Sequence, residues 1–416
     1  MKDEYMKWFR DAKYGLFIHF GLYTITEGEY NGVTTPFNAE WIMNHINIPL
    51  EEYVKLAGKF NPVKFDAEDI VLRAKAWGMR YIVFTAKHHE GFALYHSKCS
   101  PFNVVDATPF KRDILKELQL ACEKHKMPLG LYYSQAQDWH DPDGLAYHRD
   151  NAGKDFRAYL ERKCKPQLRE LLTEYGDIAI LWFDTQLTMT KEESRECRDI
   201  VKELQPNCII NGRLGNFLGD YKTTSDNLIP LLPYEGAWEI PATLNNTWSY
   251  KKADQNWKDP NEIIRKLIKI VGRGGNYLLN IGPYPDGSIP EPSVDILDAV
   301  AEYVNANAEA IFETKLMPAF PYDTEWFMLT AKDYKLYINV LQVPPRMHIV
   351  TIRNKIKRAY IVHTKEEVPF VQQLSCENEG YWEFELPDSV KGKKHFTLCV
   401  ETEEKCPIFE PIFSNA

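Results

Sequence analysis

Polar side chains follow several short apolar runs in this 416-residue sequence. Asp184 comes directly after the run IAILWF, and His88 and His89 follow YIVFTAK. Other runs are followed by His19, Tyr132 and Arg213, and a further segment carries Glu235, Trp238 and Glu239. Carboxylates can act as nucleophiles or as general acids and bases, whereas imidazole, hydroxyl and guanidinium groups bind polar ligands. The pattern predicts one site assembled from the ends of several strands.

Asp184 is the strongest single candidate. A carboxylate beside Trp182 at the end of an apolar run costs free energy unless it has partners or a task. An aspartate at this point could equally be the N-cap of the next helix. The position alone supports both interpretations, and the polar residues at the neighbouring strand ends favour a functional role.

The adjacent histidines His88 and His89 have three interpretations. A metal site requires a further ligand at a regular spacing, as in the motif HExxH, and the sequence contains no such motif. Both cannot point into a core from one strand, because adjacent strand residues face opposite ways. At a strand end, however, both can turn toward one ligand, and binding of ligand hydroxyls is favoured. His19 alone is more typical of a satisfied core histidine.

The apolar runs alternate with amphipathic segments over the first three quarters of the chain. Strand-like runs lie at residues 15–19, 81–87, 129–134, 178–184, 208–212, 237–242 and 277–281, and helix-like segments lie at 66–77, 113–126, 156–175, 192–204 and 292–314. Continuous apolarity is typical of strands that are buried on both faces of a parallel sheet. Seven or eight such units predict a (β/α)8-like, TIM-type barrel, which takes about 250 residues. In such a barrel the site forms at the carboxyl ends of the strands.

The pattern of apolar and polar residues changes near residue 315. Short alternating runs follow at residues 326–331, 335–341, 346–353, 359–363, 381–386 and 395–401, with turn residues between them. This pattern is typical of a small antiparallel β-sandwich. The sequence therefore predicts a catalytic barrel over residues 1–315 and a C-terminal β-sandwich over residues 316–416.

Composition excludes several classes of protein. The net charge of −9 disfavours a nucleic-acid partner, because phosphate binding requires a basic surplus. No apolar stretch is long enough to span a membrane, and the first residues contain no signal-peptide core, so we expect a cytoplasmic protein unless a signal was removed. The eight cysteines are scattered as in a reduced protein. No phosphate-binding or dinucleotide motif occurs, and we expect no cofactor and no metal.

Several long motifs resemble the α-L-fucosidases of glycoside hydrolase family 29. They are WFRDAKYGLFIHFGLYT at residues 8–24, AEWIM at 39–43, AKAWGMRYIVFTAKHHEGFALYHS at 74–97, GLYYS at 130–134, LWFD at 181–184, IINGR at 209–213, AWEIPATLNNTWSY at 237–250 and GGNYLLNIGPYPDGSIP at 274–290. They occur in the order of the family and cover roughly residues 8–315. The last hundred residues resemble the β-sandwich of the family only in texture.

The resemblance implies a retaining exo-glycosidase that removes terminal α-L-fucose from fucosylated oligosaccharides, with Asp184 as the nucleophile. It implies Glu239 as the general acid/base, with Glu235 as a rival four residues earlier. The fucose-contacting positions of the family match His19, Glu40, Trp41, His88, His89, Tyr132, Trp182 and Arg213. Trp238 adds an apolar neighbour for Glu239, and Tyr303 stands where many members place a tryptophan at the pocket floor.

Two other functions remain as alternatives. One is an exo-glycosidase for a related sugar such as L-galactose or D-arabinose, and the other is a catalytically silent sugar-binding barrel. Retaining hydrolysis requires two carboxyl groups about 5–5.5 Å apart, and the presence of Asp184 together with a candidate acid favours an enzyme. The oligomeric state and the preferred glycosidic linkage are left open.

Overall fold

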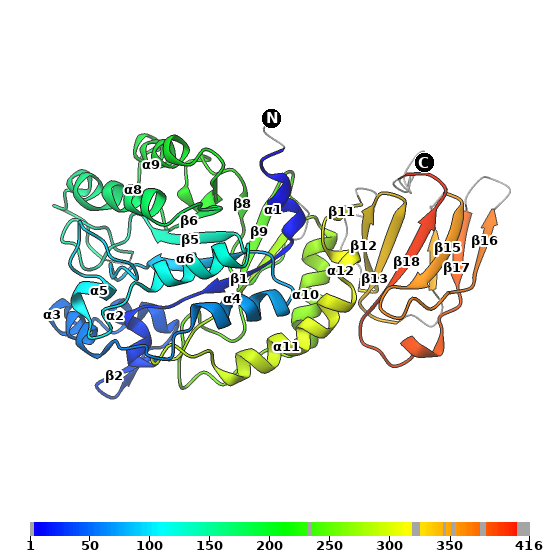
Figure 1. Cartoon of the computed structure of the whole chain (residues 1–416), viewed down its shortest axis with the longest axis horizontal. Coiled ribbons are helices and arrows are strands. Elements are labelled where there is room, and N and C mark those ends of the chain that lie inside the picture. The colour runs from blue at the N-terminus through cyan, green and yellow to red at the C-terminus, as the bar shows by residue number, and fades with distance from the viewer. Residues whose placement is uncertain are drawn as a thin grey trace.

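The computed structural model describes residues 4–147, 149–230, 234–317, 325–343, 347–350, 354–374 and 380–405. Figure 1 shows a helix-covered sheet of parallel strands, formed by the first three quarters of the chain, and a set of antiparallel strands at the C-terminal end. The two parts have separate hydrophobic cores. Within the described residues, no helix is long and apolar enough to cross a bilayer.

Eight parallel strands form the central sheet in the order β7-β6-β5-β4-β1-β10-β9-β8. They are β1 (Tyr14–Ile18), β4 (Ile82–Lys87), β5 (Leu129–Ser134), β6 (Ile180–Asp184), β7 (Ile209–Ile210), β8 (Lys222–Thr223), β9 (Trp238–Thr243) and β10 (Asn276–Ile281). The edge strands β7 and β8 meet through a parallel bridge between Asn211 and Tyr221, which completes the ring. The predicted barrel is thereby confirmed. Strand β8, only two residues long, has no recognisable apolar run.

The longer helices cover the barrel (Figure 1). They are α4 (Ala67–Ala76), α6 (Ile114–Lys124), α8 (Lys165–Glu174), α9 (Lys191–Leu204), α10 (Pro260–Gly272) and α11 (Glu291–Ala306). Four of them have a capping side chain at the amino end, for example Asp66 on α4 and Asp113 on α6. The cap of α9 is Thr190, which forms a capping box with Glu193. Asp184 is therefore not the N-cap of the helix that follows it, and the interpretation of this residue as a helix cap is excluded.

Shorter elements fill the connections. They are α1 (Lys7–Ala12), η1 (Leu22–Thr26), β2 (Glu29–Tyr30), β3 (Val33–Thr34), η2 (Ala39–Trp41), α2 (Ile42–His45), α3 (Leu50–Tyr53), η3 (Val54–Lys59), α5 (Val104–Ala107), α7 (Phe156–Tyr159), the π-helical η4 (Leu160–Cys164), η5 (Gly212–Leu214) and α12 (Ala308–Ile311). The helix predicted over 292–314 is divided into α11, which ends at Ala306, and α12, which begins at Ala308. Between them, the side-chain amide of Asn307 donates to the Tyr303 carbonyl.

The C-terminal part is built from two antiparallel sheets. The first has the order β11-β12-β13-β18-β15 and the second β14-β17-β16. Their strands are β11 (Lys315–Leu316), β12 (Phe327–Lys332), β13 (Lys335–Val340), β14 (Met347–Val350), β15 (Ile356–Ile361), β16 (Phe370–Leu374), β17 (Gly380–Phe384) and β18 (Phe396–Thr402), with the short η6 (Asp388–Val390). This agrees with the predicted sandwich, although the predicted strands include neither β11 nor β16. Residues 351–353 of one predicted strand, and Cys376 and Cys406, lie outside the described residues, and the other six cysteines are free thiols.

Candidate active site

A cavity of about 200 Å³ opens at the carboxyl ends of the barrel strands. It is lined by Phe17, His19, Asn38, Glu40, Trp41, His88, His89, Tyr132, Trp182, Asp184, Thr185, Arg213, Asp226 and Trp248. Nine of the predicted site residues are among these, contributed by the strands β5 and β6 and by segments that follow β1, β4 and β7. The strand-end pattern therefore converges on one place, as the barrel geometry requires.

Asp184, the last residue of β6, lies in the wall of this cavity. The guanidinium Nη1 of Arg213 donates to Oδ1 at 3.0 Å, and the Tyr132 hydroxyl donates to Oδ2 at 2.9 Å. The Nε2 atom of His89 is 3.6 Å from Oδ2. Burial raises the pKa of Asp184, but the charge of Arg213 and these hydrogen bonds outweigh burial, and the net pKa lies below the usual value. The carboxylate is therefore ionised near neutral pH.

Three histidines face the cavity. His19 Nδ1 lies 2.7 Å from the Asn280 side-chain oxygen, and His89 Nδ1 lies 2.7 Å from the Ser134 hydroxyl. His88 Nδ1 is buried without a hydrogen-bond partner. Burial lowers the pKa of His19 to about 3 and of His89 to about 4, and it holds that of His88 well below its usual value. The imidazoles are therefore neutral, as groups that bind hydroxyls should be.

Glu40 and Trp41 are supplied by the short helix η2. The Glu40 side chain accepts from the Ser249 backbone N–H at 3.1 Å and from the Thr247 hydroxyl at 3.3 Å, and its Oε1 atom has no partner. Burial raises the pKa of Glu40 to about 7. A buried carboxyl group with one vacant oxygen is suited to binding two ligand hydroxyls.

An aromatic wall closes the cavity. Trp182 is buried, stacks on Tyr132 with ring centroids 5.6 Å apart, and lies 4.9 Å from the Arg213 guanidinium carbon. Phe17 packs against Trp182 at 5.0 Å. Such a wall offers an apolar face beside the charged groups, which is the combination that a sugar ring with polar edges and apolar faces requires.

The prediction for Glu239 requires a correction. Glu239 is the second residue of β9 and pairs with Asn276, the first residue of β10, so it lies at the amino end of the barrel. It accepts hydrogen bonds from Trp182 Nε1 at 2.8 Å and from the Tyr81 hydroxyl at 2.7 Å. Because it does not line the cavity, its geometry does not support the acid/base role. The rival Glu235 is exposed before β9 and does not line the cavity either.

Two predicted substrate contacts also lie elsewhere. Trp238 begins β9, and its indole N–H donates to the Arg273 carbonyl at 3.3 Å. Tyr303 lies on α11, where its hydroxyl is 3.2 Å from the Thr397 hydroxyl of β18. Tyr303 thus joins the barrel to the C-terminal sheets and does not form the floor of the cavity.

Five residues of the cavity are not among the predicted site residues: Phe17, Asn38, Thr185, Asp226 and Trp248. Asp226 is the one among these five with an ionisable side chain. It follows β8 and forms an ion pair with Arg213, which also binds Asp184. Its loop is held against β9, since the Thr224 and Asn227 backbone N–H groups each donate at 3.0 Å to carbonyls of that strand. The preceding strand is too short to show an apolar run, and only the turn-like Ser-Asp-Asn sequence marks the place.

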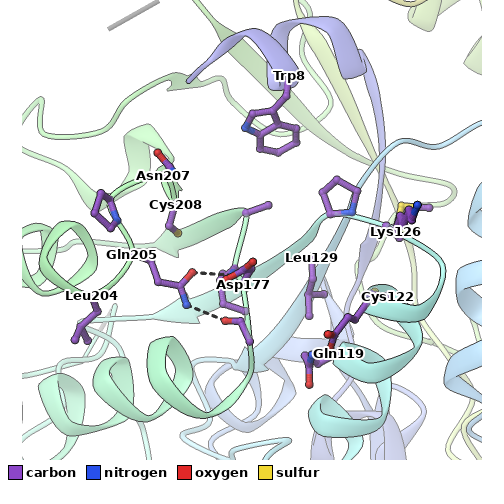
Figure 2. Close-up of a pocket in the computed structure, with 17 residues that line it drawn as sticks. Trp8, Gln119, Cys122, Lys126, Leu129, Asp177, Leu204, Gln205, Asn207 and Cys208 are labelled. Atoms are coloured by element: carbon purple, nitrogen blue, oxygen red, sulfur yellow. Dashed lines mark hydrogen bonds between the residues drawn. The ribbon is translucent and has the colours of Figure 1, made fainter. Parts of the chain in front are cut away.

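A larger cavity of about 720 Å³ lies at the opposite end of the barrel (Figure 2). Figure 2 shows Trp8, Leu129 and Cys208 around it and the Gln205 amide hydrogen-bonded to the turn before β6. These contacts hold the chain segments that enter the strands. Because barrel enzymes place their chemistry at the carboxyl ends of the strands, we assign the site to the smaller cavity.

The site combines two carboxylates on one guanidinium, neutral histidines and an aromatic wall. Within the described residues, no group of three or more histidine, cysteine or acidic side chains is arranged to hold a metal ion. A sugar-sized cavity with paired carboxylates at the mouth of a (β/α)8-like barrel is the arrangement of a glycoside hydrolase.

Comparisons with known proteins identify the family. The family model "Alpha-L-fucosidase" matches residues 1–309. A putative α-L-fucosidase from Caenorhabditis elegans is 30% identical over 338 residues, covering 74% of this chain and 67% of that protein. Plasma α-L-fucosidase from Homo sapiens is 29% identical over 344 residues, covering 74% and 69%. The chain belongs to the α-L-fucosidase family.

Solved structures agree with this assignment. An α-L-fucosidase from Vibrio sp. strain EJY3 is 31% identical with a TM-score of 0.90, covering 97% of this chain and 74% of that chain. An α-L-fucosidase from Lactobacillus casei, in complex with its α-L-fucose product, is 43% identical with a TM-score of 0.70, covering 74% of this chain and 99% of that chain. The Vibrio protein is therefore similar over barrel and sandwich together.

Proposed function

We propose that this protein is a retaining exo-α-L-fucosidase that hydrolyses terminal α-L-fucose from fucosylated oligosaccharides. The observation that carries the proposal is the pair Asp184 and Asp226, both bonded to Arg213 at the wall of one cavity. Two carboxylates on one guanidinium lie close together, as a double displacement requires. The cavity volume of about 200 Å³ is below that of drug-sized ligand sites and suits a single sugar ring.

Asp184 is the nucleophile in this proposal. Its carboxylate attacks the anomeric carbon of fucose and forms a covalent fucosyl ester while the bond to the leaving oxygen breaks. The ionised state that Arg213 maintains is the state that a nucleophile needs. In the second step, water attacks the same carbon and releases the Asp184 carboxylate.

Asp226 is the general acid/base in place of Glu239. The leaving group departs toward solvent, so the residue that protonates it should lie at the mouth of the cavity. The Asp226 side chain is 41% exposed. Glu40, the third carboxyl group in the cavity besides Asp184 and Asp226, is 1% exposed. In its protonated form Asp226 gives a proton to the departing oxygen, and the carboxylate that results, paired with Arg213, takes a proton from the attacking water. Glu40 instead binds fucose hydroxyls.

The related structures support an α-L-fucoside as substrate. Two solved structures of one similar protein, a variant of the α-L-fucosidase AlfC, are described as complexes with 4-nitrophenyl-α-L-fucopyranoside and with Fucα(1,6)GlcNAc, and that protein is 42% identical to this chain over 74% of its length. We test the function with aryl glycosides of L-fucose, L-galactose and D-arabinose. The fucoside should be preferred by roughly tenfold or more, because the C5 methyl group meets an apolar wall. Binding without turnover of the fucoside would instead indicate a silent sugar-binding barrel.

His88→Ala should weaken fucose binding. The unpartnered, buried Nδ1 of His88 is available to a sugar hydroxyl, and a buried hydroxyl without a partner costs about 1–3 kcal/mol, or roughly 5–150-fold in affinity. Inhibition by free fucose measures the effect, and His96→Ala, at a half-exposed histidine, is the matched control. Activity should survive EDTA. Loss of activity with EDTA and recovery with zinc would assign the histidines to a metal.

Glu239→Gln tests a positioning role for Glu239. Its two oxygens accept from Trp182 and Tyr81, and an amide has only one oxygen, so one donor loses its acceptor. We expect a loss of about 1–3 kcal/mol in the free energy of unfolding and a misplaced indole. The value of kcat/KM should fall by the same factor for good and poor leaving groups. A loss confined to poor leaving groups would restore Glu239 as the acid.

The difference in stability between the wild type and Glu239→Gln should depend on pH in a defined direction. Burial raises the pKa of Glu239 from 4.5 to about 7, against hydrogen bonds that lower it. Between these values the native state holds a proton that the unfolded state releases, so this group stabilises the fold less as pH rises. The stability advantage of the wild type over Glu239→Gln should therefore shrink from pH 4.5 to 7. Denaturant titrations of the wild type and the variant at both pH values measure this advantage. If the difference in free energy of unfolding is the same at both pH values, the raised pKa of Glu239 is contradicted.

A further inference from the structure

Two of the cavity histidines have a hydrogen-bond partner behind the ring. His19 follows β1, and its Nδ1 atom lies 2.7 Å from the side-chain oxygen of Asn280 on β10. His89 follows β4, and its Nδ1 atom lies 2.7 Å from the hydroxyl of Ser134, the last residue of β5. Because burial lowers the pKa of both rings, each is neutral and has one N–H and one lone pair. The partner of Nδ1 therefore decides what Nε2 offers to a ligand.

The orientation of the Asn280 amide is determined by a backbone carbonyl. Its Nδ2 group donates to the Trp248 carbonyl at 2.6 Å, and the flipped amide would place two oxygens at this distance. The Asn280 oxygen therefore faces His19, and an amide oxygen can only accept. His19 must donate from Nδ1, which leaves a lone pair on Nε2. Both side chains are buried, so bulk water does not compete for this bond.

The proton of the Ser134 hydroxyl is engaged by another backbone carbonyl. Ser134 Oγ donates to the Gln137 carbonyl at 2.9 Å. If this proton pointed to His89 instead, the two oxygens would face each other without a proton between them. Ser134 therefore accepts from Nδ1 of His89, and Nε2 of His89 also carries a lone pair. Ser134 and His89 are buried as well.

The tautomer of His89 matters for the carboxylate in front of the ring. Nε2 of His89 lies 3.6 Å from Oδ2 of Asp184. A proton on Nε2 would give Asp184 a third donor besides Arg213 and Tyr132, and each donor stabilises the ionised carboxylate and weakens it as a nucleophile. With the proton on Nδ1, the ring adds no donor to Asp184. Its lone pair is then available to a ligand hydroxyl.

We propose that Asn280 and Ser134 are positioning residues that fix the tautomers of the two rings they contact. Each ring then carries its proton on Nδ1 and accepts, through Nε2, a hydrogen bond from a sugar hydroxyl. The proposal rests on the function proposed above for the identity of the ligand. Neither Asn280 nor Ser134 lines the cavity, so neither is a substrate contact. Glu40 adds a further acceptor, since its Oε1 atom has no partner.

The tautomers can be measured in the free protein, labelled with ¹⁵N at histidine. Long-range ¹H–¹⁵N spectra separate protonated from unprotonated ring nitrogens, and His19→Gln and His89→Gln assign the two rings. In the wild type we expect both rings to be protonated on Nδ1 and unprotonated on Nε2. A wild type with the proton of either ring on Nε2 would overturn the proposal, whether or not any variant of the positioning residues folds.

Ser134→Ala and Asn280→Leu remove the two acceptors one at a time. In Ser134→Ala the proton of His89 should move to Nε2 while His19 is unchanged, and Asn280→Leu should have the converse effect. Each variant loses one hydrogen bond to the sugar, so the inhibition constant of free fucose should rise roughly three- to tenfold. The value of kcat should fall more in Ser134→Ala, because His89 is the ring that faces Asp184.

Thr314→Val is the matched control. Thr314 is buried and its hydroxyl also donates to a carbonyl, that of Ile311 at 2.9 Å, but it lies outside the cavity. Its loss should lower stability without changing either tautomer or the inhibition by fucose.

Three kinetic results would overturn the proposal. The control could weaken inhibition as much as the two variants do, the variants could weaken inhibition with both tautomers unchanged, or the tautomers could change without an effect on inhibition. The second result would mean that Asn280 acts through Trp248, which lines the cavity. A wild type with the expected tautomers that does not hydrolyse α-L-fucosides would instead contradict the proposed function.

Discussion

Replacement of Asp184 by glycine is expected to lower kcat on an aryl α-L-fucoside at least about 10³-fold while the protein remains folded. The variant removes the carboxylate that forms the fucosyl ester. Arg213 keeps Asp226 as an ionic partner, and His89 is neutral, so no buried charge loses its only partner. Circular dichroism and fucose binding show whether the fold and the pocket persist.

Azide distinguishes a lost nucleophile from general damage. In Asp184→Gly, the space of the carboxylate admits a small anion, which can attack the anomeric carbon in its place. Azide should restore part of the activity and yield β-L-fucosyl azide, with a single inversion at carbon 1. Activity close to that of the wild type without azide would contradict the assignment of Asp184.

Replacement of Asp226 by alanine should produce a loss that depends on the leaving group. A general acid contributes about 10²–10⁴-fold where the leaving oxygen needs a proton. We therefore expect a loss of this size on Fucα(1,6)GlcNAc and a far smaller one on 2,4-dinitrophenyl α-L-fucoside, whose leaving group is acidic. Steady-state kinetics on both substrates measure the ratio of the two losses.

The products of Asp226→Ala provide a second criterion. Azide should accelerate release of the fucosyl ester and give α-L-fucosyl azide, because two inversions restore the configuration. Glu239→Gln should show neither the leaving-group dependence nor the azide effect. If Glu239→Gln shows both effects and Asp226→Ala neither, the acid/base role returns to Glu239, and the role of Asp184 is unaffected.

Much of the barrel could be predicted because its strands are buried on both faces. A strand such as β6 reads as a continuous apolar run, and the first polar residue after it, Asp184, marks its carboxyl end. The competing interpretation as an N-cap could not be removed from the sequence. It depends on where α9 begins, and Thr190 provides that cap.

The acid/base could not be predicted in the same way. A run such as AWEIPAT has polar residues near both ends. The sequence alone therefore does not show that Glu239 lies at the amino end of β9 and not at the carboxyl end. Asp226 follows a two-residue strand whose position depends on pairing with β9. Tyr303 stands where the resemblance implies a tryptophan at the pocket floor, but it packs against a sheet that is remote in sequence.

The most direct test of the central claim is to trap the covalent intermediate. Incubation with 2-deoxy-2-fluoro-α-L-fucosyl fluoride should slow both steps and leave a fluorofucosyl ester on the nucleophile, because the fluorine at carbon 2 destabilises the cationic transition states. Peptide mapping by mass spectrometry should place one label per chain on Asp184. A label on another carboxylate, or a wild type that turns over α-L-fucosides to β-L-fucose without any label, would contradict the account.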